Sequence, residues 1–218
     1  ITGAEKGFVD FQGHDFSFRG MSGVEDACIS GAGHLVFFKG TDTVPAIDFV
    51  EKYYNGDSEK QLIGGSVYAT EHSVMCAGGQ EGEFETISRL ITDLYPGGIV
   101  SVVSDTWDLF RLVTEYLPRL KDQIMKREGK LVIRPDSGIP HKILCGNPDA
   151  ISEPDRKGIV RLLAETFGTQ ENSKGYKSLD PHIGTIYGDG IDLYEQLKIL
   201  NGLKNTGFES TTTVLGMG

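Results

Sequence analysis

Four aspartates of the sequence each come shortly after an apolar run. The aspartates are Asp42, Asp105, Asp136 and Asp189, and the runs that precede them are 34–38, 99–103, 131–133 and 183–187. In a parallel α/β barrel the active site is built from loops at the carboxyl ends of the strands, so carboxylates after several strands indicate a catalytic site. Single aspartates there also serve as turn and helix N-cap residues. Here four aspartates share a position shortly after an apolar run, and one of them lies within Arg-Pro-Asp-Ser-Gly. This repetition favours the catalytic interpretation.

An aromatic ring and a guanidinium lie close together in the glycine-bracketed segment 13–20. They belong to Phe16 and Arg19. A planar ring can stack on an aromatic ligand, and the arginine fork can bind phosphate oxygens. The pair therefore predicts a planar aromatic ligand that carries or meets a phosphate. A core phenylalanine beside a surface arginine is the alternative.

A histidine follows a carboxylate in Thr70-Glu71-His72-Ser73, which the pattern places in a polar loop. An adjacent carboxylate raises the basicity of an imidazole and fixes its orientation. Glu71 and His72 could therefore supply a general base, or a nucleophile that accepts a phosphoryl group. A solvated loop histidine is the simpler alternative. No histidine pair has the spacing of metal ligands on a helix, so no protein-held metal is expected.

Glycines flank the aspartate of Gly188-Asp189-Gly190, ahead of a helix that the pattern starts near residue 191. Glycines at a helix N-terminus let backbone N–H groups approach a phosphate, and Asp189 could accept hydrogen bonds from ribose hydroxyls. The third glycine of the dinucleotide fingerprint is missing. The segment Gly216-Met217-Gly218 is a candidate second phosphate turn.

The four apolar runs are expected to be buried strands, with helical patterns between them. The expected helices cover 45–54, 83–95, 106–126, 155–167 and 191–204. Continuous apolar strands that alternate with helices are typical of βαβ units and a parallel sheet. Two stretches rich in Pro, Gly and Asn, about 139–154 and 168–182, are expected to be irregular surface loops.

The composition is that of a globular protein, which excludes the disordered and fibrous classes. The chain has 218 residues and a formal net charge of −10. This acidic balance disfavours a nucleic-acid surface. No apolar run could span a membrane and the N-terminal segment is not a signal peptide, so we expect a cytoplasmic protein. The three cysteines, Cys28, Cys76 and Cys145, are expected to be reduced, buried thiols.

Both ends of the chain are abrupt. It lacks an initiator Met and stops just after an apolar run. We therefore expect a piece of a longer protein, in which 1–218 forms a central α/β barrel domain truncated at both ends.

Seven segments, taken in order, resemble the nicotinamide phosphoribosyltransferases of the type II phosphoribosyltransferase family. The segments are His14-Asp15-Phe16-x-Phe18-Arg19-Gly20, Phe38-Lys39-Gly40-Thr41-Asp42-Thr43, Thr70-Glu71-His72-Ser73, Ser101-Val102-Val103-Ser104-Asp105, Ile133-Arg134-Pro135-Asp136-Ser137-Gly138, Glu171-Asn172-Ser173-Lys174-Gly175-Tyr176-Lys177 and Tyr187-Gly188-Asp189-Gly190. The resemblance runs from about residue 8 to the end. It implies an irregular α/β barrel, present here as a partial chain. It also implies the reaction of nicotinamide with phosphoribosyl pyrophosphate to give nicotinamide mononucleotide and pyrophosphate, in NAD biosynthesis.

The resemblance further implies a role for each candidate residue. It places Phe16 against the pyridine ring, Arg19 near the phosphates, Asp42 with Ser101 and Arg134 around the amide, Asp136 and Asp189 at the ribose hydroxyls, Gly188 and Gly218 at the 5′-phosphate, Asp105 in the Mg²⁺-pyrophosphate region, and Glu71 beside a His72 that ATP phosphorylates. It implies Mg²⁺ bound mainly through pyrophosphate, ATP as a coupled substrate, and a homodimer with shared active sites. The family's N-terminal domain and its downstream basic residues are absent, so this chain alone is expected to be inactive or very weak.

The chemistry of the reaction agrees with these residue types. Phosphoribosyl transfer passes through an oxocarbenium-like centre, which carboxylates near the ribose and a Mg²⁺-clamped leaving group stabilise. A carboxylate at Asp42 accepts an amide N–H but repels the carboxylate of nicotinate, which favours nicotinamide as substrate. Two alternatives stay open: a nicotinate phosphoribosyltransferase, and a barrel that binds the ligand or forms an oligomer interface without catalysis.

Overall fold

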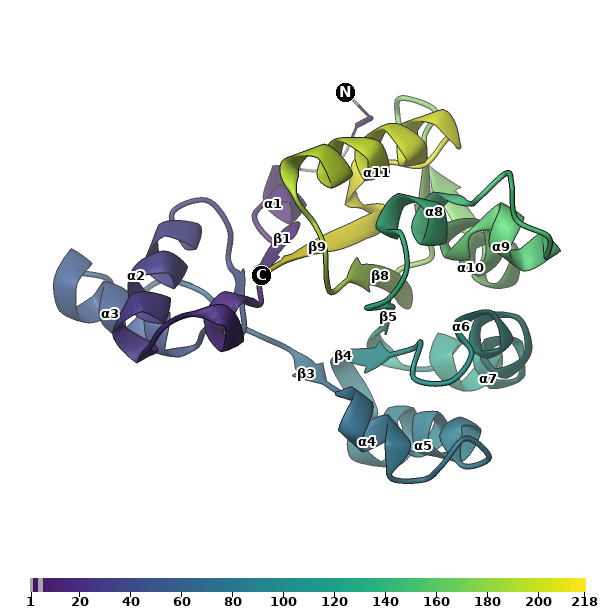
Figure 1. Ribbon diagram of the computed structural model, residues 1–218, viewed down its shortest axis with the longest axis horizontal. Helices are drawn as coiled ribbons and strands as arrows, with labels where there is room; N and C mark the ends of the chain where they lie inside the picture. The colour runs from purple at the N-terminus through teal and green to yellow at the C-terminus, as the bar shows by residue number, and fades with distance from the viewer. Residues whose placement is uncertain (1, 4–5) are drawn as a thin grey trace.

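Seven parallel strands form a curled sheet at the centre of the protein (Figure 1). Across the sheet the strands are β2 (Gly40–Thr41), β1 (Gly13–Asp15), β9 (Thr213–Met217), β8 (Ile183–Tyr187), β5 (Glu128–Arg134), β4 (Gly97–Val103) and β3 (Tyr68–Ala69). The computed structural model describes residues 2–3 and 6–218, so part of the segment on which the signal-peptide expectation rests lies outside the described residues. Because the strands are parallel, their carboxyl ends share one edge of the sheet.

The sheet curls far enough that its two ends approach each other. Gly65, just before β3, forms a parallel bridge with Gly40 of β2. Two backbone hydrogen bonds make this contact, from Thr41 N to Gly65 O and from Gly65 N to Lys39 O, each of 2.9 Å. All seven strands therefore contribute residues to the lining of one central cavity.

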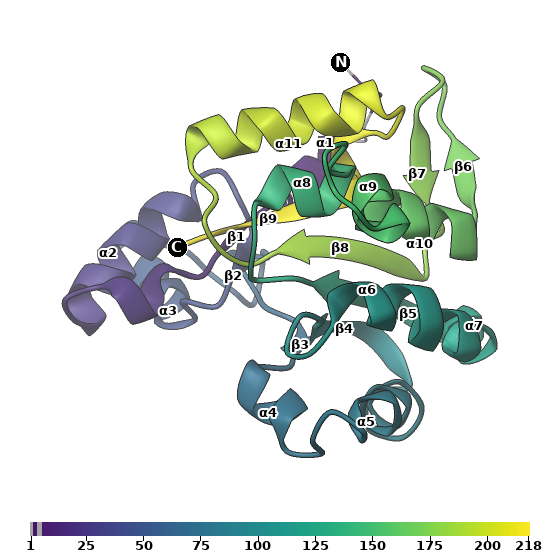
Figure 2. The same ribbon diagram turned by 45° about the vertical axis from the view of Figure 1, so that its right-hand side comes forward.

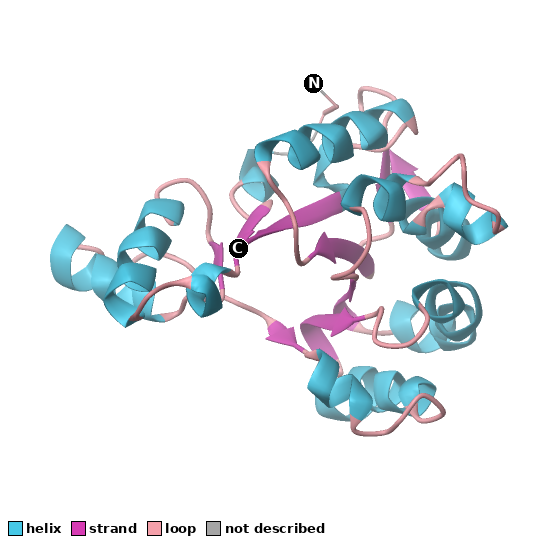
Figure 3. Cartoon of the chain, in the orientation of Figure 1, coloured by secondary structure: helices cyan, strands magenta, loops and turns pink. Residues whose placement is uncertain are grey.

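The helices lie mostly on the outside of the curl (Figures 2 and 3), but Phe8 of the first helix lines the central cavity. They are α1 (Lys6–Val9), α2 (Val24–His34), α3 (Pro45–Tyr54), α4 (His72–Cys76), α5 (Glu83–Arg89), α6 (Leu109–Arg111), α7 (Leu117–Met125), α8 (Pro140–Cys145), α9 (Glu153–Lys157), α10 (Ile159–Phe167) and α11 (Leu193–Asn205). Two π-helical turns, η2 (Leu90–Leu94) and η3 (Leu112–Tyr116), extend α5 and join α6 to α7, and two 3₁₀ turns are η1 (Ser17–Gly20) and η4 (Ser210–Thr212). Strands β6 (Thr169–Glu171) and β7 (Lys177–Leu179) form a separate antiparallel hairpin.

The main hydrophobic core lies between the central strands and these helices. Val102 of β4, Ile133 of β5 and Ile183 of β8 pack in it with Leu120 of α7 and Leu163 of α10, all of them fully buried or nearly so. Helices cover these strands, so the strands read as continuous apolar runs. The core thus fixes the strand ends that carry the candidate aspartates.

Three of the four expected strands are confirmed, and one is wrong. The runs at 99–103, 131–133 and 183–187 lie in β4, β5 and β8. The run at 34–38 instead starts at the last residue of helix α2, and a hydrogen bond from Phe38 N to His34 O closes the turn that follows. Val36 and Phe37 are exposed, at 71% and 75%, whereas Leu35 is buried. The strand that precedes Asp42 is therefore the short β2.

Most expected helices are present, with altered boundaries. The helix at 45–54 is confirmed with the expected bounds. The pattern at 155–167 contains α9 and α10, which separate at Gly158, where φ is +75°. The side chains of Asp108 and Asp192 cap α6 and α11, so these helices begin later than expected.

The prediction that two stretches are irregular loops is wrong, because both contain regular secondary structure. The stretch 139–154 contains α8 and the start of α9, and the stretch 168–182 contains the β6–β7 hairpin. The expectation of buried cysteines is also wrong for one thiol, because Cys76 is exposed whereas Cys28 is buried. Among the described residues, no helix is both long and apolar enough to cross a membrane.

A buried carboxyl group makes the stability of this fold depend on pH. Glu83 of α5 is only 2% exposed, and burial raises its pKa from 4.5 to about 7 despite the nearby Arg111. Since the folded state holds the proton more tightly than the unfolded state, this group favours folding at low pH. As pH rises from below 4.5 to above about 7, we expect the free energy of unfolding to fall by about 3 kcal/mol because of this group.

Glu83→Gln is expected to remove this contribution, because the amide stays neutral. Urea unfolding at pH 5 and pH 8 measures the difference between variant and wild type at each pH. Glu85→Gln, an exposed position on the same helix, is the control. An identical pH dependence in the Glu83→Gln variant and the wild type would contradict the prediction.

Candidate active site

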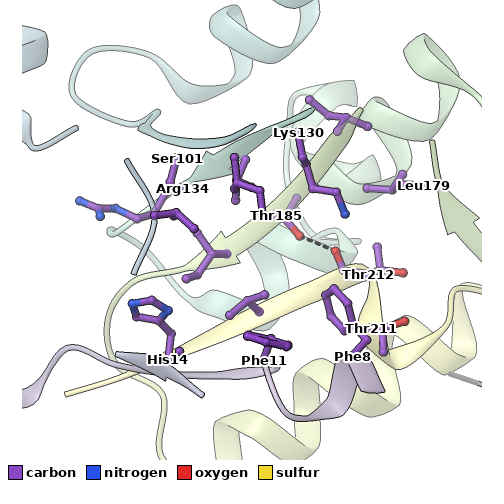
Figure 4. Close-up of a pocket in the computed structure, with 18 of the residues that line it drawn as sticks. Phe8, Phe11, His14, Ser101, Lys130, Arg134, Leu179, Thr185, Thr211 and Thr212 are labelled. Atoms are coloured by element: carbon purple, nitrogen blue, oxygen red, sulfur yellow. Dashed lines mark hydrogen bonds between the residues drawn. The ribbon is translucent and has the colours of Figure 1, made fainter. Parts of the chain in front are cut away.

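A cavity of about 710 Å³ lies inside the curl of the sheet (Figure 4). Its volume is within the range of small-molecule sites. Four of the residues predicted from the sequence line it together: Phe16, Asp42, Ser101 and Arg134. The structure therefore assembles the residue set expected around a planar base.

Phe16 lies close to both an imidazole and a guanidinium. Its ring centroid is 4.7 Å from that of His14, and the Arg134 guanidinium carbon lies 5.7 Å from it. Gly216 provides the space for this ring, because a Cβ at residue 216 would overlap it. Gly216 lies within β9, opposite His14, so the expected glycine turn at 216–218 is wrong for its first two residues.

Gly218 follows directly and lies beside the Phe16 backbone. The Phe16 N–H donates to Met217 O at 2.6 Å, and a Cβ at residue 218 would lie 3.9 Å from Phe16 O. The end of β9 therefore helps to position the aromatic ring of the cavity.

The Asp42 carboxylate receives two hydrogen bonds on one of its oxygens. His14 Nε2 lies 2.7 Å and Ser66 Oγ 2.6 Å from Asp42 Oδ1. Burial acts to raise the pKa of Asp42, but the hydrogen bonds from His14 and Ser66 and the charge of Arg134 outweigh it and lower that pKa. Asp42 therefore faces the cavity as an anion.

Arg134 connects the cavity to the carboxyl edge of the sheet. Its side chain is only 8% exposed, and its guanidinium donates to Thr70 O at 3.0 Å and lies 3.7 Å from Asp136 Oδ1. The hydroxyl of Ser101 is buried in the same region and has no hydrogen-bond partner among the residues that the structure describes. An unpaired buried hydroxyl of this kind is available to a polar atom of a ligand.

Three of the predicted aspartates meet at the carboxyl edge, outside the cavity lining. Asp105 Oδ2 accepts hydrogen bonds from Asp136 N (2.8 Å), Ser137 N (2.7 Å) and Ser137 Oγ (2.5 Å). Asp105 thus holds the loop that carries Asp136. Burial raises the pKa of Asp136; Arg134 and His72 lower it, while the charges of Asp105 and Asp189 raise it further.

His72 lies beside this carboxylate cluster. Its Nε2 is 3.7 Å from Asp136 Oδ2, and its Nδ1 is 3.1 Å from Thr106 Oγ1. The expected polar loop is wrong, because His72 is the first residue of helix α4. Glu71 makes no hydrogen bond to this imidazole in the described part of the chain, where the hydroxyl of Thr106 is the observed partner.

The strand-end carboxylates fit a magnesium-bound phosphate ligand better than a metal held by protein alone. Oδ1 of Asp105 and Oδ1 of Asp136 are buried without a hydrogen-bond partner in residues 2–3 and 6–218. Carboxylate oxygens suit Mg²⁺, which usually takes one or two of them together with substrate phosphates. The same residues contain no group of three His, Cys, Asp or Glu side chains that could hold a metal ion.

The remaining predicted residues lie around this edge. Arg19 is exposed on η1, and Asp189 is exposed after β8. Gly188 packs so closely against Asp136 that a Cβ there would overlap the carboxylate. The structure therefore gives Gly188 a steric reason to be glycine that the sequence did not indicate.

Several residues that shape the site were not predicted individually. They are His14, Ser66, Thr106 and Tyr187, whose hydroxyl donates to Ser137 O at 2.6 Å. For His14 a signal existed, because residues i and i+2 of a strand share a face and Phe16 follows at that spacing. The others come from different parts of the chain, and their contacts arise only on folding.

Comparisons with known proteins give one consistent result. Residues 11–218 match the sequence model of the Nicotinate phosphoribosyltransferase (NAPRTase) family. Over the whole chain, it is 52% identical to a protein of Acinetobacter baylyi named nicotinamide phosphoribosyltransferase, of which it covers 44%. Proteins of the same name from Mycoplasma pneumoniae and Xanthomonas campestris are 40% and 35% identical over 97% and 98% of the chain, which covers 44% and 42% of them. The chain thus spans less than half the length of these curated relatives.

Proposed function

Because the chain belongs to the nicotinate phosphoribosyltransferase (NAPRTase) family, we propose that it is the catalytic barrel section of a nicotinamide phosphoribosyltransferase. The intact enzyme would condense nicotinamide with phosphoribosyl pyrophosphate to nicotinamide mononucleotide and pyrophosphate, in NAD biosynthesis. One observation carries the proposal: an aromatic ring, an anionic acceptor and a hydroxyl with no partner among the described residues line one cavity beside a carboxylate edge.

The cavity would hold the pyridine ring against Phe16. Asp42 would accept a hydrogen bond from the amide N–H, and Ser101 Oγ would pair with another polar atom of the ligand. A carboxylate ligand would instead face the Asp42 anion and be repelled. This arrangement supports the amide over the acid as substrate.

The reaction would take place where the cavity meets the carboxyl edge. The ring nitrogen attacks C1′ of the ribose as the bond from C1′ to the pyrophosphate oxygen breaks, and the bonding electrons leave with pyrophosphate. No proton is transferred in this step. Asp136 and Asp189 would bind the ribose hydroxyls and stabilise the positive charge that develops on the sugar. Arg19, with the backbone at Gly188 and Gly218, would meet phosphate oxygens.

Magnesium would enter with the pyrophosphate group. Asp105 and Asp136 would contact it through their Oδ1 atoms, which accept no hydrogen bond from the described residues. When bound, Mg²⁺ neutralises charge on the leaving group.

ATP coupling would use His72. Thr106 holds Nδ1 and leaves Nε2 toward the carboxylate edge, so Nε2 would attack the γ-phosphorus of ATP as ADP leaves. We also propose that the protein is cytoplasmic and forms a homodimer with shared active sites, as the family resemblance implies.

The test is an assay of the intact protein with nicotinamide or nicotinate, phosphoribosyl pyrophosphate and Mg²⁺, with and without ATP. We expect mononucleotide from nicotinamide, stimulated by ATP, and much less from nicotinate. Absence of nicotinamide mononucleotide under all conditions would overturn the proposal. Ligand binding without turnover would favour the non-catalytic barrel.

Asp42→Asn is expected to narrow the preference for the amide over the acid. The amide side chain keeps a hydrogen-bonding oxygen but loses the charge that repels nicotinate, so the ratio of kcat/KM values should fall by about tenfold or more. Asp48→Asn, at an exposed position on α3, is the control. A wild type that prefers nicotinate would instead support the nicotinate phosphoribosyltransferase.

A further inference from the structure

The oxygen atoms of Asp42 are used unequally. Both hydrogen bonds to this carboxylate, from His14 Nε2 and from Ser66 Oγ, end on Oδ1. Oδ2 accepts none from the described residues. Two donors from separate elements therefore fix the rotation of the carboxylate and leave one oxygen to a ligand.

His14 is held in place more firmly than the carboxylate that it contacts. Its side chain is 11% exposed, against 40% for Asp42. The imidazole packs on Gly40, where a Cβ would come closer to Nδ1 than real Cβ atoms do, and its other neighbour is the ring of Phe16. A buried imidazole thus orients a carboxylate that reaches into the cavity.

Ser66 approaches Asp42 from the opposite end of the curled sheet. It follows Gly65, whose backbone pairs with residues 39 and 41 of the segment that leads to Asp42. The serine hydroxyl is therefore placed by main-chain hydrogen bonds rather than by side-chain packing. Removal of the hydroxyl alone should leave this placement intact.

We propose that His14 and Ser66 are positioning residues for base selection. They direct the free oxygen of Asp42 at the amide N–H of the ligand. They also keep the carboxylate from rotating or taking up a proton, either of which would let it bind the carboxylate of nicotinate. This inference rests on the proposed function. It assigns to the two residues an effect on base binding and on the choice between amide and acid, and none on phosphoribosyl pyrophosphate.

The experiment uses the intact protein and the variants His14→Leu, His14→Gln and Ser66→Ala. Initial rates give KM for nicotinamide, KM for phosphoribosyl pyrophosphate, kcat and the ratio of kcat/KM for nicotinamide over nicotinate. In His14→Leu we expect KM for nicotinamide to rise about tenfold and the ratio to fall about tenfold, because a charge-assisted hydrogen bond is lost. KM for phosphoribosyl pyrophosphate should change by less than about twofold. Ser66→Ala should shift the same two quantities in the same direction, to a smaller extent.

His14→Gln is the conservative variant, because the glutamine Nε2 can place an N–H near the position of the histidine Nε2. It should restore most of the base selection that His14→Leu loses. His182→Leu is the matched control, since this imidazole also contacts an aspartate, Asp180, at 2.7 Å. It lies before the first residue of β8, at the amino end of the strand and away from the carboxyl edge of the sheet. This variant should leave all four kinetic quantities close to those of the wild type.

The outcomes separate the inference from the function on which it rests. A wild type that makes no mononucleotide overturns the proposed function and this inference with it. An active wild type overturns the inference alone if Ser66→Ala and a folded His14→Leu keep the wild-type KM for nicotinamide. The inference is also overturned if kcat/KM falls equally for nicotinamide and nicotinate, or if His14→Gln does not restore base selection. If His14→Leu does not fold, as thermal unfolding will show, Ser66→Ala and His14→Gln decide the question.

Discussion

Replacement of Asp136 by asparagine is expected to lower kcat of the intact enzyme by a factor of about 10² to 10³. The Asp136 carboxylate contacts two charged or ionisable side chains of the site. Its Oδ1 lies 3.7 Å from Arg134 Nε, and its Oδ2 lies 3.7 Å from His72 Nε2. Asparagine keeps the shape but removes the negative charge that faces the developing cation on the sugar. Steady-state rates with saturating nicotinamide and phosphoribosyl pyrophosphate measure the effect.

The same residue should set the acid limb of the pH profile. Burial and the neighbouring Asp105 and Asp189 raise the pKa of Asp136 above its usual value of 3.8. In the proposed mechanism the ionised form of Asp136 is the active one, so kcat/KM should fall as pH falls through that raised pKa, and Asp136→Asn should lack this limb. Asp122→Asn, on the exposed face of α7, is the control. A variant with near-normal kcat would show that this carboxylate does not take part in the reaction.

Replacement of Gly188 by alanine is expected to lower kcat by a factor of about 10². The new methyl group would overlap the Asp136 carboxylate and displace it from its position between Arg134 and His72. The φ angle of Gly188 is outside the left-handed region, so the backbone itself accepts alanine. Kinetic constants and thermal unfolding of the same preparations separate displacement of the carboxylate from loss of the fold.

Two comparisons make this prediction specific. Gly33→Ala, in α2, adds a methyl group in open space and should leave kcat unchanged. In the Asp136→Asn background, Gly188→Ala should cost little more, because both changes act through one side chain. Fully additive losses in the double variant would mean that Gly188 acts through another group, such as a phosphate contact of its backbone.

The sequence predicts the site best where one physical rule decides the geometry. Parallel strands bring their carboxyl ends to one edge, so the positions of Asp105, Asp136 and Asp189 after apolar runs were enough to group them. The runs themselves were recognisable because β4, β5 and β8 are buried under helices. These strands needed no information from distant parts of the chain.

The sequence fails where tertiary contacts override a local pattern. The apolar residues at 34–38 have the composition of a buried strand, yet they form a turn directly after α2 in which Phe37 is exposed. The helix within 139–154 likewise left no simple periodic signal. In the site, the partners of Asp42 lie 28 and 24 residues away and the partner of His72 lies 34 residues away, and no spacing rule connects them.

The bridge between Gly40 and Gly65 joins the two ends of the curled sheet, and we call this junction the seam. Elsewhere neighbouring strands share ladders, but here two main-chain hydrogen bonds join the sheet's first and last parts. Local opening is least costly where the fewest contacts must break. Asp42 and Ser66 stand on the two sides of this seam, and their side chains join across it. The carboxylate that we propose selects the base is therefore hydrogen-bonded across the place where main-chain hydrogen bonds join the two ends of the sheet around the cavity.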